Sequence, residues 1–425
     1  MIDFLFEDIE NLTNFNTCND TNTSGIKRFG ISPLVSATNM YYVRKKVKSK
    51  LNFLPHTEKS DKYIISSSVN HSPDDWTGYN PKVKSLFEYL SEKYLNDLRN
   101  RKALLLLDQS FEGYQTPWLW KWFHDECEKY NVSPECIVYV TGNMIVEDVY
   151  DEWVKNNDIK EKICVIGYPH FELDVAMNCE QKSLSDNKLP TFEDHIIHKT
   201  KNDIKTFSCL NKRIRPHRVW FYNYLYQSGI LQDGLVSMNN FMEHGYWWEG
   251  KVMEIEIVKE LNSSLPLKVY DLGNDTLDDS FYINRFNPEV CMDTFVSVVS
   301  EAHCGDSDDT LFLSEKIFKP IASRHPFMVM GNRGSIEKMR EMGYKTFDQY
   351  IDQSYDNLPT HERLLKIVDS LKQINSIEDK IEWFKKMEDD IEYNYELLQS
   401  RINTKPPKSF EKLHNYYKNF FKVLI

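Results

Sequence analysis

Two short, largely apolar runs with a polar helix start between them constrain the fold of this chain most strongly. The runs span residues 294–299 and 326–330, and their length and composition are typical of strands buried on both faces. Ser314 lies between them, at a position that suits the N-cap of a helix. A strand, a helix and a second strand in this order predict a parallel α/β domain.

The helix start after Ser314 carries residue types that suit a bound phosphate. A helix N-terminus has unpaired backbone N–H groups and a partial positive charge, so it attracts anions. We expect Lys316 and Lys319 to neutralise a diphosphate, and Glu315 to accept hydrogen bonds from sugar hydroxyls. Pro320 predicts one helical turn, a kink and a short continuation. A solvated helix end is the simpler alternative for this segment.

A second polar segment also predicts phosphate binding. Residues 206–210 are typical of a short strand, and Pro216 suits the first turn of a helix that ends near Gly229. Ligands of open α/β sheets bind at the carboxyl ends of strands, and arginine binds phosphate oxygens bidentately. We therefore predict a phosphate site here, with a solvated basic loop as the alternative, and the sequence does not tell which arginine reaches the phosphates. The polar residues of this connection are Asn211, Lys212, Arg213, Arg215 and Arg218.

Together these segments resemble the donor-nucleotide domain of GT-B glycosyltransferases over residues 200–350, and Ser314-Glu315-Lys316 resembles the Thr-Glu-Lys segment of the α1,3-fucosyltransferases. The resemblance implies that Glu315 binds the ribose hydroxyls of the donor and that Lys316 lies beside its diphosphate. Glu301 stands where that group carries an acidic residue before the motif, which implies a contact with the donor sugar. Lys319-Pro320 and the insertion at 303–310 depart from the group, so fucose and guanosine stay open as donor parts.

Alternating apolar runs and amphipathic stretches predict two Rossmann-like domains. The first domain should contain strands 62–68, 103–107, 136–141 and 163–167 and helices 82–98, 117–130 and 147–155. The polar stretch 179–201 should be the boundary. Beyond it, we expect strands 206–210, 234–238, 294–299 and 326–330, with helices 216–228 and 250–261 and a helix that ends at 342.

We therefore predict a GT-B-like α/β fold with two Rossmann-like domains that face a central cleft. The N-terminal, acceptor-side domain should span 1–190, and the nucleotide-sugar-binding domain 200–358. A helical segment at 359–425 should follow, with a break at Pro406-Pro407. Its last helix, from Phe410 to Val423, should cross back to the N-terminal domain, as in many GT-B proteins.

Composition excludes several other classes of protein. The chain has 425 residues, enough for two domains of ordinary size. Its formal net charge of −12 argues against a general binder of nucleic acid or anionic membranes. No apolar run reaches the roughly 18 residues of a membrane-spanning helix, and residues 1–10 lack the basic start of a secretory signal. The eight cysteines form no Cys-x-x-Cys pair, which favours free thiols and a cytoplasmic location.

We expect the transfer to be metal-independent and to need no cofactor beyond a nucleoside-diphosphate sugar as donor. The histidines lack metal-ligand spacing. Asp306, Asp308 and Asp309 come closest to the Asp-x-Asp motif of metal-dependent GT-A enzymes, but Gly305 and Ser307 are equally typical of a flexible loop. No metal ligands are therefore predicted.

A base that takes the proton of the acceptor hydroxyl should follow a strand of the first domain. Asp108 and Glu112 follow the strand 103–107, and His170 follows the strand that ends at Gly167. A helix cap or structural acceptor is an equally good role for Asp108, and a retaining enzyme needs no such base.

The sequence predicts a hexosyl- or fucosyltransferase-like glycosyltransferase that moves a sugar from a nucleoside-diphosphate sugar to a hydroxyl of a glycan or other acceptor. Two alternatives stay open. One is a glycosyltransferase that acts on hydroxylated DNA bases, for which the basic cluster at 44–50 is the candidate contact surface. The other is a non-catalytic nucleotide- or glycan-binding protein.

Overall fold

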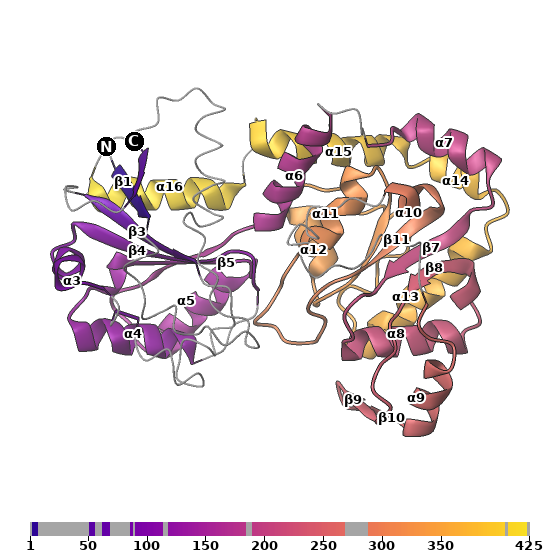
Figure 1. The fold of residues 1–425 in the computed structure, drawn as a ribbon, viewed down its shortest axis with the longest axis horizontal. Coiled ribbons are helices and arrows are strands. Elements are labelled where there is room, and N and C mark those ends of the chain that lie inside the picture. The colour runs from indigo at the N-terminus through magenta and orange to yellow at the C-terminus, as the bar shows by residue number, and fades with distance from the viewer. Residues whose placement is uncertain are drawn as a thin grey trace. The chain divides into compact units, whose positions relative to one another are not determined.

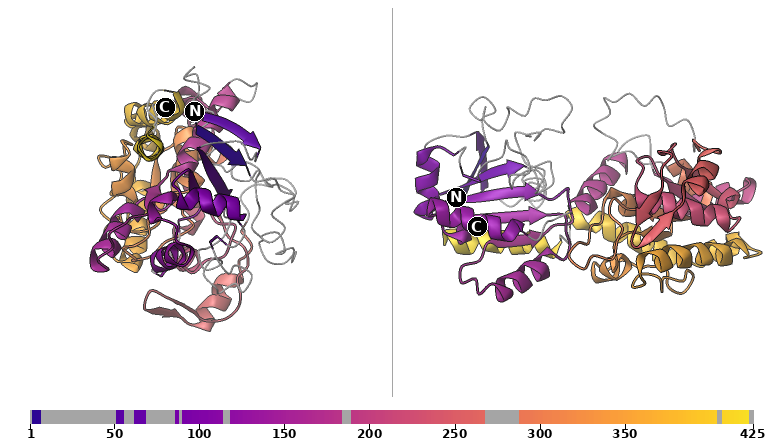
Figure 2. Two further views of the ribbon diagram at one scale, coloured as in Figure 1. Left: turned by 90° about the vertical axis from the view of Figure 1, so that its left-hand side faces the viewer. Right: turned by 90° about the horizontal axis from the view of Figure 1, so that it is seen from below.

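The chain folds into two compact α/β units, each built on a parallel sheet covered by helices (Figure 1; Figure 2). The first unit comprises Met1–His170 and Ile402–Ile425, and the second comprises Phe171–Arg401. The computed structural model describes residues 2–6, 51–55, 62–68, 86–87, 90–113, 118–183, 189–267, 288–403 and 407–422.

Among its described residues, the first unit has a six-stranded parallel sheet in the order β2-β1-β3-β4-β5-β6. Because β2 and β3 pair with β1 on opposite sides, the strand order reverses between β1 and β3, where an open α/β sheet offers a ligand crevice. The strands are β1 Ile2–Phe6, β2 Leu51–Pro55, β3 Tyr63–Ser68, β4 Ala103–Gln109, β5 Ile137–Thr141 and β6 Cys164–Gly167.

Both faces of this sheet are covered by helices. Leu105 and Leu107 of β4 pack in one apolar core with Trp120 and Phe123, and the helices of this core are α3 (Glu92–Arg99), α4 (Leu119–Tyr130) and α5 (Val146–Asn156). Helix α16 (Lys408–Phe421) contacts β6 and lies on the opposite side of the sheet from α4 in Figure 1. The chain thus returns to the first unit after it has completed the second.

The second unit is built on four parallel strands in the order β12-β11-β7-β8. These are β7 Lys205–Leu210, β8 Gly234–Ser237, β11 Thr294–Ser300 and β12 Phe327–Met330. Every residue of β11 is buried, as its apolar sequence predicts. Since β8 and β11 flank β7 on opposite sides, the strand order reverses between β7 and β11.

Helices cover this sheet, and four of them, α12 to α15, follow its last strand in the chain. Helix α13 contacts α8, β7 and β12, whereas α11 contacts β11 and β12. A short antiparallel hairpin, β9 Tyr246–Trp248 and β10 Lys251–Met253, precedes α9. The helices are α6 His170–Ser183, α7 Phe192–Lys201, α8 Pro216–Gln227, α9 Ile255–Asn262, α10 Pro288–Met292, α11 Glu315–Ala322, α12 Ser335–Glu341, α13 Thr360–Asn375, α14 Lys380–Lys385 and α15 Glu388–Asn403.

The predicted fold class, two Rossmann-like α/β units with helices at the C-terminal end, is confirmed. The division between the units falls at His170 and not within 179–201, because α6 and α7 occupy much of that polar stretch. Helices α13 to α15 belong to the second unit and are not part of a separate segment. The predicted cleft depends on how the units are placed and stays a prediction.

Two predicted helices begin later than expected. The helix expected at 82–98 begins at Glu92 after Ser91, whose backbone is extended, and residues 82–85 and 88–89 lie outside the described part of the chain. The helix expected at 250–261 begins at Ile255, because Glu249 and Gly250 both have positive φ and turn the chain into the β9–β10 hairpin. Strands β1 and β2 were not predicted.

Among the residues that the structure describes, no helix combines the length and the apolar character needed to cross a bilayer.

Candidate functional site

The loops after β7 and β11 flank the point in the second unit where the strand order reverses. The first loop, residues 211–215, leads into α8, and the second, residues 301–314, leads into α11. Two helix N-termini therefore follow the two strands that flank the reversal. Backbone N–H groups and partial positive charge at such ends favour anions, so this edge of the sheet is the candidate site.

A buried carboxylate holds the start of α11. Ser314 is the N-cap, and its hydroxyl accepts a hydrogen bond from the backbone N–H of Lys316. Glu301 is completely buried; its carboxylate accepts the backbone N–H of Ser314 at 3.0 Å and also the Ser314 hydroxyl. Burial raises the pKa of Glu301, while Lys316 opposes the shift. The resemblance implies a sugar contact for Glu301, but in this structure both carboxylate oxygens bind the helix cap.

The charged side chains in the first turns of α11 form one cluster. Lys316 Nζ donates to Ser314 Oγ and to Glu315 Oε1, both at 3.0 Å. Burial alone would raise the pKa of Glu315, but Lys316 and Lys319 together hold it below its ordinary value. Burial lowers the pKa of Lys319, and Glu315 opposes that shift. Glu315 is therefore a carboxylate between two lysines, and the side chain of Lys316 keeps 33% of its surface exposed, so its ammonium can meet a ligand.

The structure distinguishes the three arginines of the first loop. Arg218 is buried, and its guanidinium donates to Ser300 Oγ at 2.9 Å and to the carbonyls of Arg213, Ser300 and Glu301 at 2.9, 3.2 and 3.1 Å. It thereby ties the loop after β7 to the end of β11. Arg213 is exposed, whereas Arg215 is half-buried at the N-cap of α8. Arg215 is the member best placed to bind a ligand in the site.

His303 marks where the two loops meet. Its imidazole is mostly buried against Phe312, with ring centroids 5.8 Å apart. Burial, together with the charges of Arg215 and Lys316, lowers the pKa of His303 to about 4. Both cations therefore lie close enough to act on the same ring, although one belongs to the loop after β7 and the other to α11.

Two site residues, His217 and His303, were not predicted. His217 Nε2 donates to the carbonyl of Glu301 at 3.2 Å, and burial holds its pKa well below the ordinary value. Their positions in the sequence indicated that they lie near the site, since His217 directly follows Pro216 at the helix start and His303 lies two residues after Glu301. That signal is weak, because an isolated histidine is more often a packed core residue than a ligand.

The loop at 303–310 is anchored by several contacts. The Asp306 carboxylate accepts the backbone N–H of Thr360 at 2.9 Å and lies 3.4 Å from Arg363 and 3.5 Å from Arg333. Two arginines and the start of α13 therefore bind Asp306 within the protein. Within the described residues, no group of His, Cys, Asp or Glu side chains could hold a metal ion.

Asn211 lies at the end of β7 in the same site. Its backbone N–H donates to Ser237 Oγ at 3.0 Å, and its Nδ2 lies 3.3 Å from Cys209 Sγ. The side chain is buried, yet Oδ1 has no hydrogen-bond partner in the protein. A buried acceptor of this kind is expected to bind a water molecule or a ligand.

The base candidates lie at the corresponding edge of the first sheet. Asp108 is completely buried and its Oδ1 accepts the backbone N–H of Ser110 at 3.0 Å. The carbonyl of Glu112 accepts the N–H of Gly142 at 2.8 Å, which fixes the loop after β4 against β5. The ring of His170 meets Phe111 edge to face at 6.4 Å, so the loops that carry Glu112 and His170 lie together.

Solved structures similar to this chain differ from it widely in sequence. They include OtsA in its apo form, at 7% identity and a TM-score of 0.42 over 100% of this chain and 99% of that one. A UDP-forming α,α-trehalose-phosphate synthase from Burkholderia xenovorans is 9% identical, with a TM-score of 0.40 over 96% of this chain and 83% of its own. An α1,3-fucosyltransferase with GDP-fucose is 10% identical, with a TM-score of 0.26 over 100% and 90% of the two chains.

No protein-family model matches this chain, and no curated protein does. The similarity to solved structures concerns the fold alone. The basic cluster at 44–50, which would serve a DNA-acting enzyme, lies outside the described residues. We therefore base the function on the residues of the site itself.

Proposed function

We propose that this protein is a glycosyltransferase whose nucleoside-diphosphate sugar binds in the second unit, where the strand order reverses between β7 and β11. The observation that supports this most is the convergence of Arg215 and Lys316 on His303, beside two helix N-termini. Two cations and the partial positive charges of two helix N-termini suit the oxygens of a diphosphate.

In the proposed mechanism, the second unit stabilises the departing nucleoside diphosphate. As the bond from the anomeric carbon to the phosphate oxygen breaks, negative charge grows on that oxygen. Arg215 and Lys316 neutralise the growing charge, and the partial positive charge at the N-terminus of α11 adds to their effect. Glu315 accepts hydrogen bonds from the ribose hydroxyls. Glu301 and Arg218 act indirectly, since they fix the loops that carry the ligand-binding groups.

We propose that the first unit supplies the base, and that His170 is the favoured candidate. Asp108 is completely buried and already accepts a backbone hydrogen bond, which suits a structural role. His170 is half-buried at the start of α6, and an imidazole is the side chain that most often serves as a general base. Glu112, half-buried on the neighbouring loop, is the second candidate.

Nucleotide binding tests the proposal directly. A panel of UDP, GDP, ADP, CDP and TDP is screened by thermal shift, and a ligand at 100 times its Kd should stabilise the protein by about 2.7 kcal/mol. Arg215→Ala should weaken that binding far more than Arg213→Ala on the same loop, because Arg213 is exposed. If no member of the panel shifts the melting temperature, the proposed function is wrong.

Turnover should be metal-independent, because Arg215 and Lys316 already supply positive charge to the leaving group. With EDTA present, the rate at which the nucleoside diphosphate is released from its donor sugar should change by less than about twofold. Loss of activity in EDTA, restored by manganese or magnesium, would show that a metal ion stabilises the leaving group instead of these two side chains.

A further inference from the structure

The β9–β10 hairpin has two unlike faces. Strands β9 and β10 pair through Val252 opposite Trp247 and Met253 opposite Tyr246. Tyr246 and Met253 point inward and are only 8% and 1% exposed. Trp247 and Val252 project from the other face, because successive side chains of a strand alternate.

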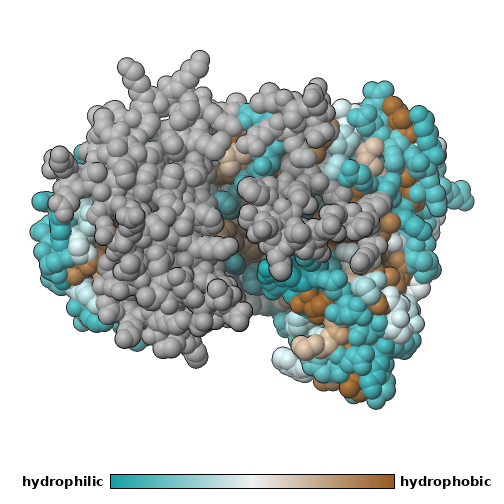
Figure 3. All heavy atoms as spheres, viewed as in Figure 1, coloured by the Kyte–Doolittle hydropathy of each residue, from teal (hydrophilic) through white to brown (hydrophobic). Residues whose placement is uncertain are grey.

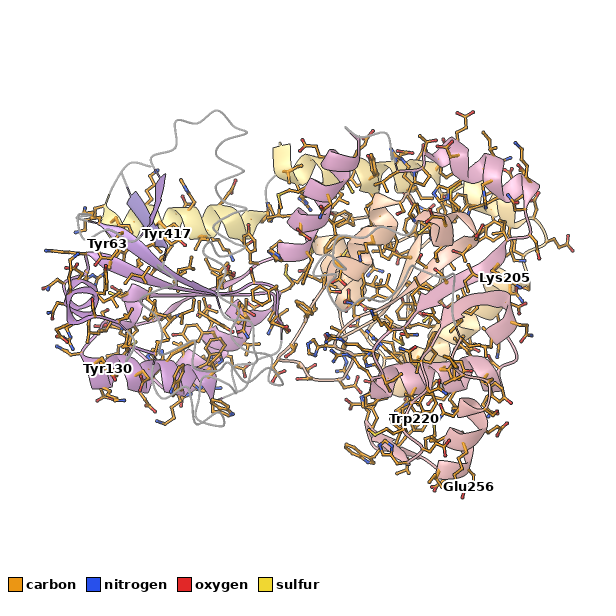
Figure 4. All side chains as sticks on the ribbon, in the orientation of Figure 1. Tyr63, Tyr130, Lys205, Trp220, Glu256 and Tyr417 are labelled. Atoms are coloured by element: carbon orange, nitrogen blue, oxygen red, sulfur yellow. The ribbon has the colours of Figure 1, made fainter. Side chains whose placement is uncertain are left out.

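The inner face fixes the hairpin to the candidate site. The indole of Trp248 lies 6.0 Å from the ring of His217 and 5.0 Å from that of His361, measured between centroids. His361 Nε2 also donates to the carbonyl of Trp248 at 2.9 Å. Trp220 of α8, labelled in Figure 4, lies 4.8 Å from His361 and completes this aromatic cluster. Since His217 donates to Glu301, the hairpin is held by the same residues that hold the site.

The outer face of the hairpin, with the segment just before it, carries very exposed large apolar side chains. Trp247 is 70% exposed and Val252 58% on the hairpin, and Met242, four residues before β9, is 73% exposed; no other large apolar side chain whose exposure the structure describes exceeds 44%. Apolar surface is visible in this region at the lower right of Figure 3, over β9, β10 and α9. An apolar patch with this much exposure marks an interaction site more often than chance.

We propose that the Trp247 face of the hairpin binds a pyranose ring of a saccharide acceptor; this proposal rests on the transferase function proposed above. The C–H face of a sugar ring packs on an indole, and its hydroxyls need polar partners at the edge. Glu243 and Glu254, which precede β9 and follow β10, are exposed and can supply them. This combination of one aromatic surface with a few polar groups is typical of small-ligand sites.

The small size of the face favours a saccharide over a second protein. A stable protein interface buries on the order of 1,000 Å² or more, whereas a fully buried aromatic side chain contributes about 150–250 Å². Two exposed apolar side chains on a two-stranded hairpin, with Met242 just before it, therefore suit one or two sugar rings. The hairpin itself adjoins the candidate site, because Trp248 packs on His217 and His361.

The test measures saccharide binding and nucleotide binding on the same proteins. Cellobiose, lactose, maltose and chitobiose are offered to the full-length protein in saturation-transfer NMR, with Trp247→Ala as the variant. Leu365→Ala serves as the control, since Leu365 is an exposed apolar residue of α13. We expect at least one disaccharide to bind, Trp247→Ala to weaken it at least about tenfold, and Leu365→Ala to leave it unchanged.

The nucleotide-induced thermal shift separates this proposal from the proposed function. An unchanged shift in Trp247→Ala shows that the variant is folded and that its donor site is intact. Equal saccharide binding by the variant and the unmodified protein, or no binding of any disaccharide, overturns the saccharide site. A dimer in sedimentation velocity that Trp247→Ala dissociates also overturns it, because the face would then join two copies. Saccharide binding lost in the variant, without any nucleotide shift in either protein, would sustain the saccharide site and reject the transferase.

Discussion

The carboxyl edges of the two sheets follow one architectural rule but carry different chemistry. In the second unit, the loops after β7 and β11 flank the reversal of strand order, and they carry Arg215 and Lys316. In the first unit, the reversal lies between β1 and β3, and the candidate bases follow β4 and β6 instead. The same fold therefore presents basic side chains at this edge in one unit and carboxylate and histidine side chains in the other.

The two edges are also held by different kinds of interaction. Buried charged side chains hold the loops of the second unit, where Arg218 bridges β7 to β11 and Glu301 binds the cap of α11. In the first unit, the buried Asp108 carboxylate accepts the backbone N–H of Ser110, only two residues away, and the backbone carbonyl of Glu112 accepts from Gly142. Buried charges cost free energy unless they are well paired, so their presence indicates a demand for fixed geometry. Substitution of Arg218 or Glu301 should therefore lower the stability of the second unit, because each leaves buried polar groups without their partner.

The largest effect expected is on catalysis, through the first unit. His170→Gln should lower the release rate of the nucleoside diphosphate in the presence of acceptor by about 10²–10⁴-fold, because a general base is lost. Nucleotide affinity should stay unchanged, since the donor site belongs to the other unit. Steady-state kinetics and thermal shift measure the two quantities.

The comparison with Glu112→Gln and Asp108→Asn makes this test decisive. A full rate in His170→Gln together with a reduced rate in Glu112→Gln would identify Glu112 as the base. A loss in Asp108→Asn alone would give the role to the buried carboxylate. Full rates in all three folded variants would favour a retaining mechanism that uses none of them.

The next effect should appear in nucleotide affinity, through the second unit. Lys316→Ala removes a partly exposed ammonium beside the expected diphosphate. Charge-assisted hydrogen bonds contribute about 1.5–3 kcal/mol, so Kd should rise about tenfold to a hundredfold. Lys338→Ala is the matched control, because Lys338 is bound to Glu341 on α12. Titration calorimetry measures the nucleotide affinity. Equal nucleotide affinity in both variants would show that Lys316 does not contact the diphosphate.

A pH dependence of stability should come from the buried histidines of the second unit. Burial, with help from Lys199, lowers the pKa of His195 to about 3, against an ordinary value of about 6.5. Between those values the unfolded chain binds a proton that the folded chain does not, so stability falls as the pH falls through this window. His195 alone should cost about 2 kcal/mol at pH 5 relative to pH 7.5.

Urea unfolding at the two pH values measures this contribution. His195→Gln should lose less stability between pH 7.5 and pH 5 than the unmodified protein does, by about 2 kcal/mol. His244→Gln, at an exposed position of the hairpin, should keep the original dependence. If His195→Gln does the same, the imidazole at position 195 is already accessible to protons in the folded state.

The smallest effect should follow from the cap of α11. Ser314→Ala removes the hydroxyl that accepts from Lys316 and donates to Glu301. Loss of an N-cap costs about 1 kcal/mol, which lowers Tm by about 2–4 °C in a unit of this size. Calorimetry measures Tm. Ser376→Ala, at the C-terminal end of α13, is the control, because the hydroxyl of Ser376 donates to the nearby carbonyl of Gln373. A fall of Tm equal to that of the control would mean that Ser314 does not stabilise the helix start.

Local sequence signals predicted the strands and helix starts that build the donor-side edge. Residues 205–210, 294–300 and 327–330 are strands within one residue of their predicted bounds. Ser314 is an N-cap and Pro216 begins a helix, since both depend on their own backbone chemistry. The hairpin before α9 could not be predicted in the same way, because positive φ at the non-glycine Glu249 is not visible in the sequence pattern.

The sequence by itself determined which residue types stand at the carboxyl ends of the strands, because apolar runs, caps and prolines act within a few neighbouring positions. Only the tertiary structure decided which of those residues are structural and which are available to a ligand. Arg213, Arg215 and Arg218 look alike in the sequence, yet one is exposed, one stands at a helix cap and one is buried across two strands. Burial and long-range pairing depend on β11, which lies more than 70 residues further along the chain. Contacts at that separation leave no local pattern that the sequence alone could show.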